Sequence, residues 1–350
     1  MSDNLLEVTD LTVRYVSSRS LVLNRPTSHI TAVDKLSLTV PRGTSYGLVG
    51  ESGSGKSSAG RALLRLEEIA GGQVVFDGQD ITNLSGEPLR QLRRRMQMVF
   101  QDPIGSLNPR QRISTILTKP LRVQGSHDRR ENLRRAGEAL ELVGLSKSVL
   151  DRWPHEFSGG QRQRIGIARA VVLNPELLVA DEPVSALDVS VQAQIINLLL
   201  DIKAELNLTS LVIAHNLAVV RQLCETVGVM YLGSLAEEAP ASQIFSTPAH
   251  PYTRALLSAA PIPDPHVEDQ RERIVLEGDP PSPAQRHKGC KFVGRCALRQ
   301  PTRCADEPPV LREIGPGHRV ACHFAELLLD EQAAATAHLP SALVTPPPAV

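Results

Sequence analysis

Residues 45–68 read SYGLVGESGSGKSSAGRALLRLEE, and this stretch decides the fold. The apolar run Tyr46–Val49 predicts a short strand, after which the chain turns through glycines and continues as a helix from near Gly55. The turn matches the pattern G-x-x-x-x-G-K-[ST]. It reads Gly50-Glu51-Ser52-Gly53-Ser54-Gly55-Lys56-Ser57. A strand, a glycine turn and a helix in this order predict an α/β protein with a phosphate-binding loop.

The chemistry of this loop is specific. Glycines let the backbone turn tightly, so that successive N–H groups point into one concavity. The positive end of the following helix is directed at the same place. We therefore expect Lys56 to reach the outer phosphates of a nucleotide and the Ser57 hydroxyl to bind Mg²⁺. A chance match of a Gly/Ser-rich loop is the alternative, and the strand–loop–helix context argues against it.

A second apolar run ends in two acidic residues. PELLVADEP (175–183) places Leu177–Ala180 before Asp181 and Glu182, which predicts a strand buried on both faces of a parallel sheet. Ligands bind at the carboxyl ends of such strands. Asp181 is then placed to hold Mg²⁺, and Glu182 is placed as the general base that orients an attacking water.

Another glycine motif precedes that strand by about twenty residues. FSGGQRQRIG (157–166) puts Ser158, Gly159, Gly160 and Gln161 at the start of a helix, which is a second site suited to an anion. One nucleotide does not need two such sites from one chain, so we expect this site to close over the nucleotide of another chain. An ordinary N-cap is the alternative.

Together these motifs resemble the nucleotide-binding subunit of an ABC transporter, with Phe157 where the family signature usually has Leu. The resemblance implies a P-loop cassette that binds ATP, with a mixed-sheet core, an antiparallel β-layer and a helical subdomain. It assigns Gln101 (MVFQDP) to the Q-loop, Asp188 (SALD) to the loop that crosses the dimer, and His215 (LVIAH) to the switch that contacts the γ-phosphate. Tyr15 (LTVRYV) matches the aromatic residue that stacks on adenine. Taken singly, each also fits a solvated loop or strand packing.

Two positions depart from the family pattern. Asn216 follows the switch histidine where Asp is common, and Ser58 replaces a frequent Thr in the phosphate loop. Neither removes a catalytic group, and Glu182 is intact. We therefore predict an ATPase that hydrolyses its nucleotide.

Composition indicates which other classes of protein the chain does not resemble. The 350 residues carry 38 Lys+Arg and 38 Asp+Glu, and this balance gives no indication of nucleic-acid binding. No apolar run approaches the roughly 20 residues needed to span a bilayer. The N-terminal MSDNLLEVTD lacks the pattern of a secretory signal. These features predict a cytoplasmic protein.

The organisation along the chain follows from the same resemblance. We expect a nucleotide-binding domain over residues 5–245, with its helical subdomain at about 102–165. TPAHPYTRALLSAAPIPDP (247–265) and EGDPPSP (277–283) resemble the C-terminal extension of the dipeptide and oligopeptide importer ATPases. We assign that extension to residues 246–325. The Ala/Pro-rich segment 326–350 is predicted to be a disordered tail.

This resemblance implies a subunit that powers peptide import from the cytoplasmic face of the membrane as a peripheral protein. Its implied partners are a second ABC ATPase (a paralogue or a second copy), two transmembrane permease subunits and an extracytoplasmic solute-binding protein. Nickel or another small solute is the alternative cargo. A soluble ABC ATPase or a metal-dependent regulator is the alternative from a different class. The single cassette with a compact middle and the intact Glu182 argue against the latter two.

Four of the five cysteines gather near the C-terminus at Cys290, Cys296, Cys304 and Cys322, with spacing C-x5-C-x7-C-x17-C. A reducing compartment disfavours disulfides and favours metal ligation. Within the importer subfamily that the chain resembles, such a group is associated with a [4Fe–4S] cluster held by four thiolates. Zn²⁺ is the alternative, although zinc ribbons usually show paired C-x2–4-C knuckles. Four unligated thiols are less favoured, because exposed thiols are open to oxidation.

Overall fold

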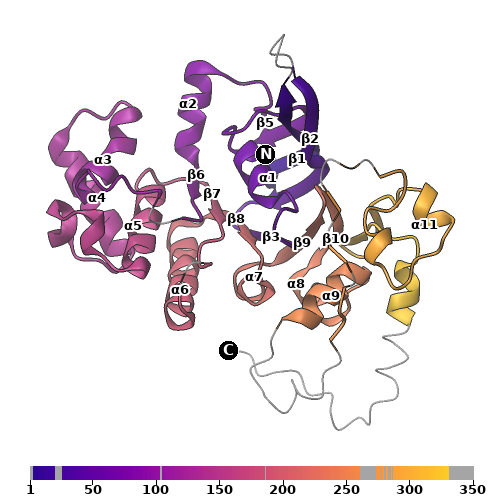
Figure 1. The fold of residues 1–350 in the computed structure, drawn as a ribbon. Coiled ribbons are helices and arrows are strands. Elements are labelled where there is room, and N and C mark those ends of the chain that lie inside the picture. Colours follow the sequence, from indigo (N-terminus) through magenta and orange to yellow (C-terminus); the bar gives the residue numbers. More distant parts are fainter. Residues whose placement is uncertain are drawn as a thin grey trace, which may run out of the picture. The chain divides into compact units, whose positions relative to one another are not determined.

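The computed structural model describes residues 3–19, 26–102, 105–185, 187–260, 273–276, 278–279, 281–282, 285 and 287–330. The chain forms two compact units. The first comprises Met1–Ser234 with Pro281–Arg286, and the second comprises Leu235–Pro280 with His287–Val350. Figure 1 shows the helices and strands of both units, coloured along the sequence.

Parallel strands form the centre of the first unit, in the order β9-β3-β8-β7-β6. They are β3 (Ser45–Val49), β6 (Met96–Val99), β7 (Leu177–Asp181), β8 (Thr209–Ala214) and β9 (Thr226–Tyr231). Every residue of β3 and β7 is buried, as expected for continuous apolar runs in a sheet covered on both faces. The predicted α/β core is confirmed.

The carboxyl ends of these strands lie along one edge of the sheet, because the strands are parallel. Gly50 follows β3, Glu182 follows β7 and His215 follows β8, while Gln101 comes two residues after the end of β6. The topology therefore gathers at one edge four site residues that are far apart in the sequence.

The predicted antiparallel layer is also present, with the strand order β2-β1-β4-β5. Its strands are β1 (Asn4–Arg19), β2 (Pro26–Pro41), β4 (Gly71–Phe76) and β5 (Gln79–Asp80). Val8 of β1 pairs with Leu38 of β2 and with Val74 of β4, and all three side chains are buried. This apolar face stabilises the layer.

The helices of the first unit include a group formed by α3, α4 and α5, which pack against one another beside the parallel sheet (Figure 1). Leu117, Leu140 and Ile165 are fully buried in this group. The helices are α1 (Lys56–Leu63), α2 (Gly86–Arg95), α3 (Ile113–Val123), α4 (Arg129–Leu142), η1 (Lys147–Asp151), η2 (Pro154–Glu156), α5 (Gly159–Val171), α6 (Val189–Leu206) and α7 (Leu217–Leu223). The group corresponds to the expected helical subdomain, with α5 continuing to Val171.

The second unit contains three antiparallel strands, in the order β11-β12-β10. Its elements are β10 (Ser234–Pro240), α8 (Ala241–Ser246), α9 (Pro251–Ala259), η3 (Val293–Arg295), α11 (Arg303–Asp306), β11 (Arg312–Gly315) and β12 (His318–Val320). Residues 325–330 are helical, and the rest of the predicted tail, 331–350, lies outside the described residues. So do positions 277, 280 and 283 of the EGDPPSP segment.

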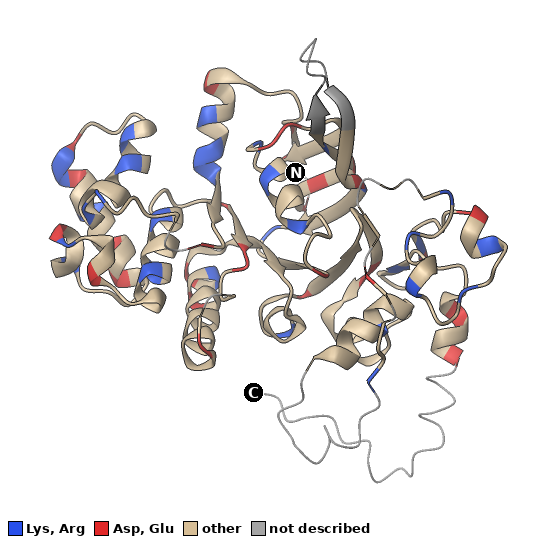
Figure 2. Ribbon diagram, viewed as in Figure 1, with Lys and Arg blue, Asp and Glu red and all other residues tan. Residues whose placement is uncertain are grey.

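Acidic and basic residues are interspersed along most of the ribbon (Figure 2). Helix α2 is an exception, because Arg90 and Arg93–Arg95 make its C-terminal half strongly basic. Among the described residues, no helix is both long enough and apolar enough to cross a membrane.

Candidate active site

The phosphate loop joins β3 to α1 and needs glycine at two points. Gly50 has φ 154°, and a Cβ there would lie 2.2 Å from the carbonyl oxygen of Met230. Gly55 has φ 100°, and a Cβ there would lie 2.1 Å from the carbonyl oxygen of Ala32. Side chains are therefore excluded by the surrounding backbone, which leaves the loop amides free to face a phosphate.

Lys56 lies across its own loop. Its Nζ donates to the carbonyl oxygens of Gly50 and Glu51, at 2.8 Å each, and to Ser54 Oγ at 3.3 Å. Burial lowers the pKa of Lys56, and the acidic pair at the end of β7 partly offsets this shift. Neutral oxygens hold the ammonium group. Phosphate oxygens can take their place, because they form stronger, charge-assisted hydrogen bonds with it.

The residues predicted to bind Mg²⁺ lie together. Ser57 Oγ donates to Asp181 Oδ1 at 2.8 Å. Asp181 is fully buried, and its Oδ2 has no hydrogen-bond partner among the described residues. Burial raises the pKa of Asp181, and the Ser57 hydroxyl opposes this shift. A buried carboxylate oxygen without a partner, beside a hydroxyl, fits a hard cation that prefers oxygen ligands.

Glu182 lies at the centre of the predicted catalytic residues. Its Oε2 accepts a hydrogen bond from Gln101 Nε2 at 2.8 Å and lies 3.3 Å from His215 Nδ1. Its φ is 45°, a left-handed value that is uncommon for a residue with a side chain. The Glu182 N–H donates to the carbonyl oxygen of Ile213, and Ser185 Oγ donates to the Glu182 carbonyl oxygen at 3.2 Å. The neighbouring strand and the following turn thus hold the strained backbone in place.

Tyr15 lies on β1, close to the start of α1. Its hydroxyl donates to Ser58 Oγ at 3.2 Å, and the side chain is half-buried. The Ser58 hydroxyl accepts this hydrogen bond, and a threonine hydroxyl at the same position could accept it equally. The departure from the family pattern at Ser58 therefore keeps this contact. The stacking of Tyr15 on adenine stays a prediction.

The glycine motif at 158–161 forms the start of α5. Ser158 Oγ accepts from the Gln161 N–H at 3.3 Å, and Gln161 Oε1 accepts from the Ser158 N–H at 3.1 Å, so the two residues form a capping box. A Cβ on Gly160 would lie 2.5 Å from Val191 Cγ1. The motif is thus both an N-cap and a largely exposed helix start, and its binding of a nucleotide stays a prediction.

Two further side chains cap helices at the edge of the site. Asp188 accepts from the Val191 N–H at 3.0 Å and begins α6, while residue 186 of the same motif lies outside the described residues. Asn216 Oδ1 accepts from the Ala218 N–H at 2.9 Å and begins α7. The departure at Asn216 therefore preserves the cap, because an amide oxygen accepts this bond as a carboxylate does.

The four C-terminal cysteines line one small cavity in the second unit, together with His250, Phe292 and Phe324. Burial raises the pKa of Cys290 and of Cys322 to about 11, and neighbouring thiols of the group add to the shift. Backbone N–H groups point at sulfur, as the Phe324 N–H does toward Cys322 Sγ at 3.4 Å. Within the described part of the chain, however, no three His, Cys, Asp or Glu side chains form a group able to hold a metal ion.

Sequence reasoning missed Arg169, eleven residues after Ser158 on the same helix. Arg169 Nη1 donates to the carbonyl oxygen of Ser106, and its guanidinium lies over the Phe100 ring at 5.6 Å from the centroid. These contacts hold the chain on both sides of Gln101. The sequence predicts that Arg169 lies on the helix that begins at the glycine motif. It does not predict which segment of the chain this arginine contacts.

The phosphate loop, the buried Asp181 and the group around Glu182 define the class as an ATP-binding cassette. Two family models match the chain: ABC transporter over residues 33–185, and oligopeptide/dipeptide transporter, C-terminal region, over residues 236–304.

Curated relatives agree with these models. The oligopeptide transport ATP-binding protein AppF of Bacillus subtilis is 49% identical over 323 residues, which cover 92% of this chain and 98% of the relative. A putative peptide import ATP-binding protein of Brucella ovis is 52% identical over 290 residues, or 83% of this chain and 90% of the relative. The chain belongs to the ABC transporter family, as one of its ATP-binding proteins.

A solved structure shows the same fold. The ATP-binding cassette MJ0796, in a dimeric post-hydrolysis state bound to ADP and Pi, matches with a TM-score of 0.60 and 28% identity. The match covers 67% of this chain and 98% of that one. The predicted cassette fold is thereby confirmed, while the cysteine-containing extension lies beyond what this comparison tests.

Proposed function

We propose that this chain is the ATP-hydrolysing subunit of a membrane importer for dipeptides or oligopeptides. The observation that carries the proposal is the meeting of Gln101 and His215 on the Glu182 carboxylate, next to an intact phosphate loop. The C-terminal match at residues 236–304 and the peptide-transport names of the relatives support the cargo class.

The residues imply the order of events at the nucleotide. The loop amides take up the phosphates of ATP, and Lys56 exchanges the carbonyl oxygens of its own loop for phosphate oxygens. Ser57 and Asp181 would hold Mg²⁺, which when bound offsets charge on the phosphates. Glu182 accepts a proton from the attacking water, while His215 contacts the γ-phosphate. Gln101 would leave Glu182 and contact the attacking water.

We propose that a second ATPase chain completes this site. Residues Ser158–Gln161 of one chain would close over the nucleotide of the other, with Asp188 crossing between them. The exposed helix start at the glycine motif supports this arrangement. ATP then favours the closed dimer and hydrolysis lets it open, which is a two-state change that ATP biases.

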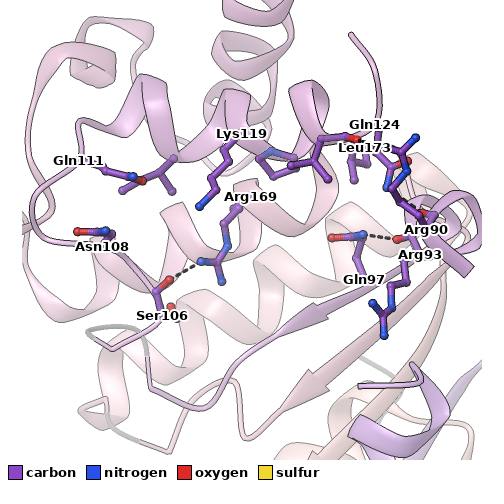
Figure 3. Close-up of a pocket in the computed structure, with 13 residues that line it drawn as sticks. Arg90, Arg93, Gln97, Ser106, Asn108, Gln111, Lys119, Gln124, Arg169 and Leu173 are labelled. Atoms are coloured by element: carbon purple, nitrogen blue, oxygen red, sulfur yellow. Dashed lines mark hydrogen bonds between the residues drawn. The ribbon is translucent and has the colours of Figure 1, made fainter. Parts of the chain in front are cut away.

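The remaining partners follow from the importer class. We place the chain at the cytoplasmic face of the membrane, bound to two transmembrane permease subunits that receive solute from an extracytoplasmic binding protein. Permease docking is assigned to the region beside the Q-loop, which contains a cavity of about 430 Å³. Figure 3 shows the residues that line this cavity. The cassette would span residues 5–245 and the extension 246–325, whereas the compact units divide after Ser234.

For the cysteine cavity we propose a [4Fe–4S] cluster, with Zn²⁺ as the alternative. The convergence of four sulfurs on one cavity supports a thiolate-bound cofactor. In a four-iron cluster each thiolate binds a different iron, so the sulfurs stand farther apart than around a single ion. When bound, the cluster would tie α11, which carries Cys304, to the loops that carry the other three cysteines. Iron, sulfide and zinc content of anaerobically purified protein decides between these cofactors: about four irons and four sulfides support the cluster, one zinc replaces it, and neither metal overturns both.

The cargo is tested in the assembled transporter. The chain is reconstituted in nanodiscs with its permease pair, and ATP hydrolysis is measured with the binding protein loaded with a dipeptide, an oligopeptide or Ni²⁺. We expect peptide-loaded protein to stimulate hydrolysis and Ni²⁺ to have no effect. Stimulation by Ni²⁺ alone, or hydrolysis that never responds to any loaded binding protein, would reject peptide import.

A further inference from the structure

A tight turn outside the sequence motifs lies against the phosphate loop. Residues 232–233 form this turn, which follows β9 and leads into β10. Strand β9 pairs directly with β3, the strand that enters the phosphate loop (Figure 1). The end of β9 therefore lies next to the start of the loop, where the carbonyl oxygen of Met230 approaches Gly50.

The turn has a backbone conformation that few residue types adopt. Leu232 has φ 42° and Gly233 has φ 84°, so both lie in the left-handed region. Two consecutive residues with positive φ are typical of a tight two-residue hairpin turn. A Cβ at Gly233 would also lie 3.0 Å from the carbonyl oxygen of Ala32. Position 233 therefore requires glycine both for its φ and for the close approach of β2.

The backbone of Gly233 is hydrogen-bonded on both sides. Its N–H donates to the carbonyl oxygen of Ser54, in the phosphate loop, at 2.9 Å. Its carbonyl oxygen accepts from the Asp34 N–H of β2 at 2.8 Å, and Ser234 Oγ donates to the Asp34 carbonyl oxygen at 2.9 Å. Strand β2 thus anchors the turn, and the turn holds the phosphate loop.

The bond to Ser54 has a consequence on the other side of the same peptide group. In a trans peptide, the C=O of one residue and the N–H of the next point in opposite directions. Because the Ser54 C=O points at Gly233, the Gly55 N–H points away from the turn. Among the described residues this N–H has no hydrogen-bond partner, and Gly55 is the N-cap of α1. It is therefore available to a phosphate oxygen at the start of the helix.

Gly55 does not fix this orientation by itself. Glycine adopts positive and negative φ about equally readily, and Gly55 has φ 100°. The peptide between Ser54 and Gly55 can therefore rotate, which would direct its carbonyl oxygen at the phosphates and repel them. The hydrogen bond from Gly233 selects the orientation that presents the N–H.

We infer that Gly233 is a positioning residue for the nucleotide: its N–H holds the Ser54 carbonyl oxygen and thereby directs the Gly55 N–H at the phosphates of ATP. The inference rests on the proposed ATP-hydrolysing role of the chain. It adds to the site a residue that is far from the phosphate loop in the sequence and has no side chain.

The first test removes a single donor from the full chain. Glycolic acid is placed at position 233 by nonsense suppression, so that an ester oxygen replaces the N–H and the φ of glycine stays accessible. We expect the Kd for ATP to rise about fivefold, as the loss of one hydrogen bond of ordinary strength predicts. Equilibrium binding of ATP measures this, and an unchanged Kd in a folded Gly233 ester would overturn the inference.

The matched control is the same ester at Gly78, in the turn between β4 and β5. Gly78 also has positive φ, at 75°, and a Cβ there would meet nothing within 4 Å. Its Kd for ATP should change less than about twofold. If the wild-type and Gly78 chains bind no ATP at all, the proposed function itself has failed.

The second test separates the phosphates from the base. The Gly55 N–H contacts no part of the base, so the Gly233 ester should raise the Kd for ATP and for GTP by the same factor. The ratio of the two affinities then stays at its wild-type value. A loss confined to ATP would show that the turn acts on the base and would overturn the inference.

The third test divides binding from turnover. A phosphate contact present throughout the reaction is uniform binding, so the Gly233 ester should raise the KM for ATP about fivefold and leave kcat nearly unchanged. Gly233→Ala should raise the KM further, because the methyl group also strains the turn, whereas Gly78→Ala should not. Thermal unfolding identifies any variant that has simply lost stability. A fall in kcat at unchanged KM in the folded ester would contradict the positioning role.

Discussion

Gln101 Nε2 donates a 2.8 Å hydrogen bond to Glu182 Oε2, the same oxygen that lies 3.3 Å from His215 Nδ1. One carboxylate oxygen therefore contacts the ends of two different strands. The proposed role of Glu182 as the general base predicts that the attacking water and Gln101 compete for this oxygen.

Glu182→Gln should remove hydrolysis without removing binding. The amide has nearly the shape of the carboxylate but does not accept a proton, so we expect kcat to fall about 10²–10⁴-fold. The Kd for ATP should change less than threefold. Phosphate release and equilibrium binding of a fluorescent ATP analogue measure the two effects.

Glu176→Gln is the control for this change, since Glu176 lies at the other end of β7 and pairs with Arg95. It should retain turnover. Turnover in Glu182→Gln equal to that of the control would assign the base to another group.

Two variants distinguish the proposed Mg²⁺ ligand Ser57 from the adjacent Ser58. Ser57→Ala removes the hydroxyl bonded to Asp181 and should raise the Mg²⁺ concentration for half-maximal hydrolysis about tenfold. Ser58→Ala removes a hydroxyl bonded to Tyr15 instead, and should leave the Mg²⁺ requirement unchanged. A Mg²⁺ titration of the hydrolysis rate checks both. Equal shifts in the two variants would contradict a specific role for Ser57.

Much of this site could be predicted because its residues follow strand ends. Apolar runs at 46–49 and 177–180 indicate buried parallel strands, and the topology of parallel strands brings Gly50, Asp181 and Glu182 to one edge. Arg169 could not be predicted in the same way. Its contacts with Phe100 and Ser106 depend on how α5 packs, and helical periodicity does not specify the partner of a packed face.

The cysteines show a similar limit. Their clustering in a reducing compartment and the resemblance to the importer subfamily predict ligation, and the structure brings all four to one cavity. Spacing does not give the distances between sulfurs, and those distances decide between one ion and a cluster. Asn216 was a departure in the sequence, whereas in the structure it is an ordinary helix cap.

The two glycines of the signature should respond differently to alanine. A Cβ at Gly160 would lie 2.5 Å from Val191 Cγ1, whereas a Cβ at Gly159 would lie 3.7 Å from Leu187 Cδ2, an ordinary contact. We expect Gly160→Ala to reduce the free energy of unfolding by about 1–3 kcal/mol and Gly159→Ala to leave it nearly unchanged. Thermal unfolding of the isolated chain measures this difference.

A double variant tests whether a clash with Val191 causes the loss of stability in Gly160→Ala. Val191→Ala removes the methyl group that Gly160→Ala would strike, so the pair should be more stable than Gly160→Ala alone. If the double variant is no more stable, the clash is not the reason for the loss.

Glu237 should be essential to the stability of the second unit. It is fully buried in β10, accepts from the Ala249 N–H at 2.7 Å and the His250 N–H at 3.1 Å, and lies 2.7 Å from His318 Nε2. In Glu237→Gln, either orientation of the amide sets its NH₂ against one of these backbone donors. We expect a loss of about 3 kcal/mol in local stability.

Hydrogen exchange measured by mass spectrometry can locate the loss. In Glu237→Gln, exchange should accelerate at the start of α9 and along β12, and ATP binding in the first unit should be unaltered. Glu313→Gln is the matched control in the same unit, because Glu313 is exposed and its side chain accepts a hydrogen bond from the Gly317 N–H at 3.1 Å. Since β12 ends two residues before Cys322, occupancy of the cofactor proposed for the cysteine cavity should fall together with this protection. Unchanged exchange in β12 would show that Glu237 does not hold that strand in place.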